Sequence, residues 1–404
     1  MEKLLTRLIA LALLVTCVVM LPVAATEANP SGTCGKNITW VLDSDGTLTI
    51  SGSGSMYIDE HDSAPWFELN DYIQKVIIED GITTIGLSAF YRCSNLSNVS
   101  IPDSIVKITD EAFSRCSSLT EITIPASVTE IGVYAFTDCS SLTSITVDPQ
   151  NPVYHSDGNC LIETATKTLH TGCSASVIPA DGSVTTIGVA AFSGCSNLTG
   201  ITIPNSIVLI DMDAFMDCTN LTDITLPDTI AEIGRAALAG CNRLTSITIP
   251  RRVQSIQSDT FYGCTSLTTI TIPDSVIEIG HRAFSGCDNL WHVLYMGSEY
   301  NWNTIEIKAN GNSSFLDAIT HHNAVGDKVD PVNKVCTICT PPPTEPPETI
   351  APTQPTETIA PLAPSEPVEG NETYAGSTVW VIVAAAVVLV VVGAVGIVLW
   401  KKKH

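Results

Sequence analysis

Residues 96–118, LSNVSIPDSIVKITDEAFSRCSS, and residues 119–141, LTEITIPASVTEIGVYAFTDCSS, share one pattern. The pattern is Leu-x-x-[Ile/Val]-x-Ile-Pro-x-x-[Ile/Val]-x-x-Ile, followed by a turn and then by Ala-Phe-x-x-Cys or a close variant of it. The cysteine recurs every 23 residues in two blocks, at Cys93, Cys116 and Cys139 and again at Cys195, Cys218, Cys241, Cys264 and Cys287. One such unit cannot bury its apolar side alone, so the fixed period predicts a solenoid of stacked coils.

Within the unit that begins at Leu119, apolar and polar residues alternate. Ile122 and Ile124 alternate with polar neighbours, which predicts a short strand with one buried face. Pro125 follows and ends the strand, because proline has no N–H to offer a neighbouring strand. The largest apolar residue of each unit is expected to stack on its equivalents as a buried aromatic spine. The expected spine residues are Phe90, Phe113, Phe136, Phe192, Phe215, Phe261 and Phe284, with Leu238 in their place in one coil.

Residues 270–287, ITIPDSVIEIGHRAFSGC, closely resemble the repeat of the BspA-like leucine-rich repeat proteins, a family of bacterial and some protist cell-surface proteins. The resemblance extends over about residues 73–295. It implies a β-rich solenoid, a right-handed superhelix of about ten coils. It also implies a part in binding host matrix proteins or other cells. Thr109, Asp211 and Gln257 depart from the pattern, because glycine is usual at their position.

The two ends of the chain have the composition of targeting and anchoring segments. Lys3 and Arg7 precede an apolar run, which predicts a secretory signal peptide over residues 1–25. Residues 379–400 carry no charge and are followed by three lysines, which predicts a transmembrane helix with a cytoplasmic tail at 401–404. We therefore expect a single-pass protein at the cell surface, with its amino-terminal part outside the cell.

Changes in composition along the chain indicate the boundaries of the segments between these ends. The expected order is an N-terminal β cap at 26–72, the solenoid at 73–295, a C-terminal cap with a Cys-x-x-Cys segment at 296–340, and a stalk rich in Pro, Thr and Glu at 341–378. The repeat is interrupted at 148–174, where Asp157-Gly158 and the run from Thr164 to Leu169 predict a β-hairpin insertion. This insertion is either a folded bulge on the solenoid edge or a protruding loop that shapes a binding site.

Charge and motifs argue against several classes of function. The formal net charge of −23 disfavours nucleic acid as a partner. The sequence contains no zinc-protease, phosphate-loop or serine-hydrolase motif in a fitting context, so we expect no enzyme, no catalytic residue and no cofactor. Cys336 and Cys339, with His321 and His322, do not match the spacing of a known zinc finger, and no metal site is expected.

The cysteines fall into two groups. Those at the repeat position face their neighbours with parallel side chains, a geometry that resists the torsion of a disulfide, so they are expected to be buried free thiols. Cys160 and Cys173 lie outside this series and are the candidate disulfide pair in a secreted chain.

The exposed positions of the stacked strands form the candidate binding surface, because a solenoid presents them as one broad face. The residues at this position are Asn98, Glu121, Ser144, Gly200, Asp223, Ser246, Thr269 and His292, beside a row of mostly threonines. The leading hypothesis is a surface-anchored protein that binds an extracellular protein or adheres to other cells. A glycan-binding protein and a structural spacer without a ligand remain the alternatives.

Overall fold

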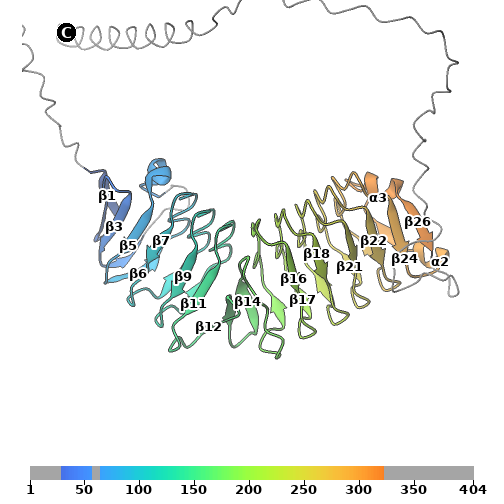
Figure 1. Ribbon diagram of the computed structural model, residues 1–404, viewed down its shortest axis with the longest axis horizontal. Helices are drawn as coiled ribbons and strands as arrows, with labels where there is room; N and C mark the ends of the chain where they lie inside the picture. The colour runs from blue at the N-terminus through green and yellow to red at the C-terminus, as the bar shows by residue number, and fades with distance from the viewer. Residues whose placement is uncertain (1–28, 57–63, 323–404) are drawn as a thin grey trace, which may run out of the picture. The chain divides into compact units, whose positions relative to one another are not determined.

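The computed structural model describes residues 29–56 and 64–322, and the coils of this part stack side by side (Figure 1). These residues belong to one compact unit, Met1–Cys336, while the second unit, Thr337–His404, is wholly outside the described residues. The expected signal peptide, Cys-x-x-Cys segment, stalk, transmembrane helix and tail also lie outside the described residues. In the part of the chain that is described, no helix is long and apolar enough to cross a membrane.

Most coils contribute a strand to a first row and then a strand, usually shorter, to a second row, whereas residues 175–197 contribute only the second-row strand β15. The first row is β3 (Thr47–Gly52), β5 (Lys75–Ile78), β7 (Asn98–Ser100), β9 (Glu121–Ile124), β11 (Ser144–Val147), β16 (Gly200–Thr202), β18 (Asp223–Thr225), β20 (Ser246–Thr248), β22 (Thr269–Ile272), β24 (His292–Tyr295) and β26 (Ile319–His322). The second row is β4 (Gly54–Ser55), β6 (Ile82–Ile85), β8 (Lys107–Ile108), β10 (Glu130–Ile131), β14 (Thr168–Thr171), β15 (Thr186–Ile187), β17 (Leu209–Ile210), β19 (Glu232–Ile233), β21 (Ser255–Ile256), β23 (Glu278–Ile279) and β25 (Glu306–Ile307).

Within each sheet, neighbouring solenoid strands of a row pair in parallel, whereas β7 and β9, β11 and β16, and β18 and β20 belong to different sheets. Ile122 of β9, for example, lies opposite Ile145 of β11, and Ile247 of β20 lies opposite Ile270 of β22. The buried isoleucines alternate with exposed polar residues, as the period-2 pattern predicts. Counting the turn made by β3 and β4, the described chain forms a β-solenoid of about eleven turns, against about ten expected.

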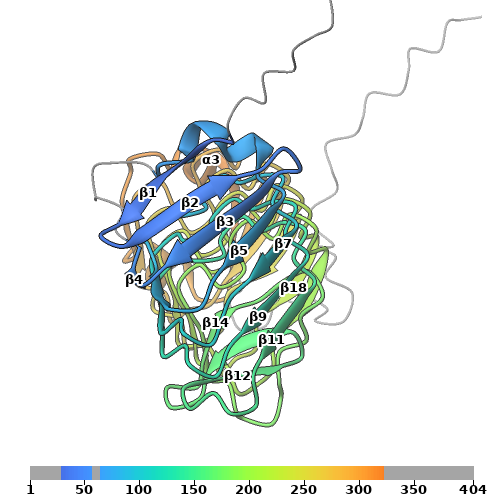
Figure 2. The ribbon, with the colours of Figure 1, turned by 90° about the vertical axis from the view of Figure 1, so that its left-hand side faces the viewer.

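An antiparallel sheet lies across the first coil, where the N-terminal cap was expected. The strands β1 (Ser31–Gly35), β2 (Ile38–Leu42) and β3 form it, and Figure 2 shows them at the near end of the stack. β3 then pairs in parallel with β5, which joins this sheet to the solenoid. Trp66, just before the short 3₁₀ helix η1 (Phe67–Tyr72), donates its indole N–H to the Ala89 carbonyl at 2.8 Å. The apolar face of the first coil is thereby covered.

The aromatic spine runs through the buried interior in three pieces. Phe90, Phe113 and Phe136 stack with ring centroids 5.2 and 5.5 Å apart, and Trp66 extends this piece. Phe192 stacks on Phe215 at 5.1 Å, and Phe261 stacks on Phe284 at 5.4 Å. One break falls at Leu238, as expected. The other break falls between Phe136 and Phe192, at the interrupted coil, and the sequence did not predict how this coil fills the interior.

The interrupted coil, residues 142–174, contains an antiparallel meander. β12 (Tyr154–Asp157) pairs with β13 (Cys160–Glu163), which pairs with β14, and β14 joins the second row beside β15. β13 is buried on both faces: Cys160 and Ile162 belong to the core cluster on its C-terminal side, whereas Leu161 belongs to the cluster on its N-terminal side. The segment is therefore built into the stack, and differs from both the edge bulge and the protruding loop that the sequence suggested.

Side chains replace the missing backbone pairing at this junction. β10 and β14 do not form a ladder, and the Ile131 N–H instead donates to the Tyr154 hydroxyl at 3.1 Å. The Ile131 carbonyl lies 3.2 Å from Nε2 of His170. The Asn151 amide donates to the carbonyls of Pro125 and Val128. The N–H and carbonyl of Ile131, which lack a backbone partner in the next coil, are thus satisfied by Tyr154 and His170, and Asn151 supplies further hydrogen bonds to the same coil.

The last coil lacks the repeat sequence but keeps the repeat geometry. After β24 the chain forms α2 (Glu299–Trp302), β25, α3 (Ser313–Asp317) and β26, and Phe315 stacks on Phe284 at a centroid distance of 4.4 Å. The buried Asn312 accepts from the Phe284 N–H and donates to the Gly280 carbonyl. The 23-residue pattern is not recognisable after residue 290, because this coil is built from different residues.

Candidate functional site

The first candidate surface is the strand face, which consists of the outward-pointing residues of the first row of strands. It includes the residues that the sequence predicted. In-register pairing places Glu121 opposite Ser144, Gly200 opposite Asp223, Ser246 opposite Thr269, and Thr269 opposite His292. Asn98 takes the same position on β7, opposite Lys75 of β5. Asn98, Glu121, Asp223 and Ser246 are exposed, and Ser144, Thr269 and His292 are partly so. The predicted residues therefore form columns along the first row of strands.

The neighbouring column on the strand face consists of hydroxyl groups. Thr123 and Thr146 hydrogen-bond through their hydroxyls at 2.9 Å, as stacked threonines on adjacent strands commonly do. At the end of the face, Nδ1 of His292 lies 3.2 Å from Nε2 of His321 on β26. Burial, followed by the nearby His292 and His322, lowers the pKa of His321. This face is thus polar and shallow, suited to a broad contact.

A second surface, which we call the turn face, is formed by the turns around Ala-Phe-x-x-Cys. Two positions in almost every coil adopt positive φ: the residue before Ala, and the residue before Cys. The first is occupied by Ser88, Glu111, Tyr134, Ala190, Asp213, Ala236, Asp259 and Arg282, and the second by Arg92, Arg115, Asp138, Gly194, Asp217, Gly240, Gly263 and Gly286. Such a backbone is unusual outside glycine and fixes the direction of each side chain, so these residues form two rows along the stack.

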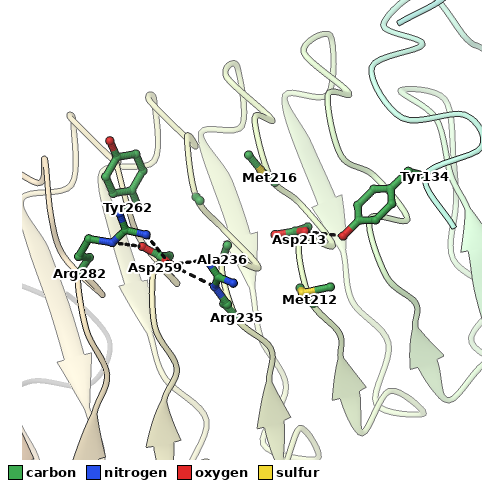
Figure 3. Close-up of a pocket in the computed structure, with 10 residues that line it drawn as sticks. Tyr134, Met212, Asp213, Met216, Arg235, Ala236, Asp259, Tyr262 and Arg282 are labelled. Carbon is green, nitrogen blue, oxygen red and sulfur yellow. Dashed lines mark hydrogen bonds and ion pairs between the residues drawn. The ribbon is translucent and has the colours of Figure 1, made fainter. Parts of the chain in front are cut away.

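Three charged residues of the turn face form an ion triad: Asp259 and Arg282 belong to the first row, and Arg235 precedes Ala236 of that row. Asp259, whose side chain is 9% exposed, lies between Arg235 and Arg282 from the coils on either side (Figure 3). Nη2 of Arg235 lies 3.1 Å from Oδ2 of Asp259, and Nε of Arg282 lies 2.8 Å from Oδ1. Such charge-assisted contacts hold both guanidinium groups in place.

The triad borders a hollow of about 580 Å³ on the turn face. Its other end is formed by Tyr134, whose hydroxyl donates to Oδ2 of Asp213 at 2.8 Å. Burial, and then the hydrogen bond to Asp213, raise the pKa of Tyr134 to about 12, so the hydroxyl stays protonated near neutral pH. Met212, Met216, Ala236, Ala239 and Tyr262 complete the lining.

A second, more open hollow of about 500 Å³ follows the other row of the turn face. Arg115 forms an ion pair with Asp138 at 3.3 Å, and the Arg92 and Arg115 guanidinium groups lie over the Tyr91 ring. Burial, and next the charge of Asp138, raise the pKa of Asp217. Sequence reasoning missed both hollows. Aligning the coils would have indicated the first one, because Ala236 and Ala239 stand where neighbouring coils carry larger residues.

The repeat cysteines are buried free thiols with a hydrogen bond that the sequence did not reveal. The thiols of Cys116 and Cys218 each donate, at 3.2 Å, to the carbonyl of the phenylalanine one coil before, Phe90 and Phe192. Burial raises the pKa of Cys139 and Cys241 to about 12, which keeps these groups protonated.

The candidate disulfide pair belongs to the interrupted coil, and its covalent bond stays a prediction. Cys160 and Cys173 are separate, buried thiols in the structure. The Cys160 thiol donates to the Gly158 carbonyl, and that of Cys173 donates to the Asn159 carbonyl. Each thiol thus has a backbone acceptor in the turn before β13, where the sequence predicted a covalent bond.

No metal centre emerges within residues 29–56 and 64–322, where no group of three or more His, Cys, Asp or Glu residues could hold an ion. The expected absence of a catalytic residue and a cofactor remains an expectation. Proteins with this fold and repeat are typically non-enzymatic.

The fold defines a leucine-rich repeat solenoid. The family model described as "BspA type Leucine rich repeat region (6 copies)" matches residues 64–181 and 167–291, and the chain belongs to this family. Membership implies a protein-interaction or surface role.

Three solved structures of bacterial proteins are similar to the chain. A leucine-rich repeat protein from Eubacterium ventriosum is 25% identical over 66% of this chain and 84% of its own, with a TM-score of 0.48. A leucine-rich cell surface protein from Faecalibacterium prausnitzii is 27% identical over 71% of this chain and 100% of its own, with a TM-score of 0.43. The pneumococcal vaccine antigen PcpA is 16% identical over 74% of this chain and 89% of its own, with a TM-score of 0.41. No curated protein matches the chain.

Proposed function

We propose that the protein is a cell-surface module that binds an extracellular protein or adheres to host or other cells. The observation that carries the proposal is the column of exposed side chains in register on the strand face, from Ser246 through Thr269 to His292 and its equivalents in other sheets. Family membership supports a protein partner, since leucine-rich repeat proteins generally bind proteins. A broad, polar contact of this kind relies on complementarity over many positions.

The proposed location is the cell surface, with a single membrane-spanning helix. The support is in the sequence: a signal peptide over residues 1–25, a stalk over 341–378, and an uncharged apolar run over 379–400 followed by lysines. A stalk of extended chain, at about 3.1 Å per residue, would hold the solenoid away from the membrane.

The test measures binding of the full-length chain to purified extracellular matrix proteins and, in parallel, to a glycan array. We expect saturable binding to a protein. Changing Glu121→Lys and Asp223→Lys together inverts two exposed charges of the strand face and should weaken that binding at least tenfold. The matched control is Asp103→Lys with Glu232→Lys, which makes the same charge change at exposed positions outside this face.

The two variants separate the alternatives. Equal affinity of both variants and the unchanged chain would contradict the strand face as the binding surface. Binding to glycans alone would favour polysaccharide capture, and saturable binding to neither would favour a structural spacer.

A further inference from the structure

The hollow on the turn face exists because one coil has small side chains where its neighbours have large ones. In the coil of residues 221–243, Ala236 and Ala239 occupy the positions held by Asp213 and Met216 in the preceding coil. The same positions are held by Asp259 and Tyr262 in the following coil. The larger residues therefore form two walls, and Ala236 lies between them (Figure 3), in the coil that also supplies Ala239 to the lining.

One end of the hollow is cationic. Arg235 and Arg282 share the single carboxylate of Asp259, so this end has one positive charge in excess, which the Asp213 carboxylate at the far end balances over the whole lining. Their side chains remain 60% and 50% exposed, and each guanidinium has five N–H donors, so both retain donors for a further acceptor. The triad also fixes both groups beforehand, which lowers the entropic cost of binding an anion.

The rest of the hollow combines apolar side chains with the carboxylate of Asp213 at the far end. Met212 and Met216 lie on either side of Asp213 (Figure 3), and the Tyr262 ring is 47% exposed beside the Arg282 guanidinium. Asp213, held by the Tyr134 hydroxyl, lies opposite the arginines (Figure 3). Tyrosine, methionine and arginine are the residues enriched where proteins contact proteins, and methionine adapts to varied apolar partners.

We propose that this hollow binds a protein segment that carries an acidic side chain next to an apolar one. The carboxylate lies against Arg235 and Arg282, and the apolar side chain lies against Met212 and Met216. The assignment rests on the proposed protein-binding function and adds to it a second site, with a stated chemistry, away from the strand face. An acidic glycan would share the carboxylate but would not use the methionine surface.

The test uses the full-length chain with isotope-labelled methionine methyl groups, whose signals report on Met212 and Met216 directly. The probe is acetyl-leucyl-aspartyl amide, and its matched control is acetyl-leucyl-asparaginyl amide, which differs only in the charged group. We expect the aspartyl probe to shift both methyl signals with a dissociation constant of roughly 1 mM. The asparaginyl probe should bind about tenfold more weakly, because charge-assisted hydrogen bonds are the stronger ones.

Two variants test the residues. Arg282→Gln should weaken the aspartyl probe about tenfold, whereas Arg251→Gln, the same change at an exposed arginine outside the hollow, should not. Ala239→Tyr adds a large side chain to the lining without replacing a residue of the ion triad, and Tyr262 at the same repeat position shows that the turn accepts this residue. We expect it to abolish the methyl shifts even if Arg282→Gln impairs folding.

Several outcomes would overturn the assignment. Equal binding of the two peptides would show that the carboxylate is not recognised. Undiminished methyl shifts in Ala239→Tyr would show that the peptide does not bind in the hollow. Glucuronate binding in place of the aspartyl probe would favour an acidic glycan. Failure of the strand-face variants to affect protein binding leaves these results unchanged, so the two proposals fail separately.

Discussion

The regular coils of residues 198–287 and the interrupted coil of residues 142–174 solve the same packing problem differently. A regular coil fills the spine position with Phe or Leu, and its backbone pairs with both neighbours. In the interrupted coil Gly172 takes the place of the spine residue: its N–H donates to the Ala191 carbonyl, as Phe192 does to Ala214 in the next coil. The interior is filled instead by β13, with apolar side chains on both faces.

The comparison teaches where a repeat tolerates change. The regular coils depend on the spine, whereas the interrupted coil depends on a doubly buried strand and on polar side chains that take over backbone hydrogen bonds. Even the thiols differ: Cys218 lies 3.2 Å from the Phe192 carbonyl, but Cys195 lies 3.8 Å from that of Gly172. The two regions should therefore respond differently to the same kind of substitution.

The largest expected effect comes from removing a spine ring inside the regular stack. Phe215→Ala should cost about 3–5 kcal/mol of unfolding free energy, because it leaves a fully buried cavity. Phe136→Ala should cost less, since Phe136 is 5% exposed and the next spine position is Gly172, whereas Phe215 is fully buried between the positions of Phe192 and Leu238. Urea denaturation followed by circular dichroism measures both. Equal losses would show that the interrupted coil packs as tightly on the spine as a regular one.

A smaller effect is expected from adding one carbon at Gly172. A Cβ there would overlap the buried Phe192 ring, and we expect a loss of about 1–3 kcal/mol for Gly172→Ala. Gly200→Ala is the control, because its added Cβ would meet only the Asp223 carbonyl oxygen at 3.5 Å, an ordinary contact. If the denaturation midpoints of the two variants agree, Gly172 does not hold the spine position.

The smallest effect is a pH dependence confined to the interrupted coil. Burial lowers the pKa of His170 below its usual 6.5, against the opposing influence of the Ile131 carbonyl and Glu163. The unfolded chain therefore takes up this proton first, so the stability that neutral His170 contributes is present above pH 6.5 and is lost as the pH falls below it. Hydrogen exchange at the Ile131 amide should accelerate at pH 5.5 relative to the Ile233 amide in a regular coil. His170→Gln should remove the difference, and its persistence would point to another group.

The solenoid could be predicted from the sequence because the same pattern of apolar and polar residues recurs in each coil. Ile122 and Ile124 alternate with polar residues, Pro125 ends the strand, and Phe136 recurs at a fixed spacing, so a local pattern determines a local structure many times over. The strand-face residues followed for the same reason: a fixed register places Glu121 beside Ser144 without further information. Their binding role is still a proposal.

The remaining features depend on contacts between residues far apart in the chain. Tyr134 meets Asp213 across the interrupted coil, and Arg235 and Arg282 meet at Asp259 from different coils. The 23-residue period places Asp259 beside Arg282, but it does not predict the contact of Tyr134 with Asp213, which depends on how closely the turns stack across the interrupted coil. The Cys160–Cys173 disulfide stays a prediction, and each thiol has a nearby backbone acceptor.

The sequence by itself determined the period, the strands, the buried spine and the exposed columns, because each depends only on the alternation of apolar and polar residues within 23 positions. The tertiary structure alone decided that residues 148–174 enter the core, that residues after 290 complete a further coil, and that the turns enclose a hollow. These outcomes depend on packing between coils, where the volume and hydrogen-bonding groups of one turn must fit those of the next.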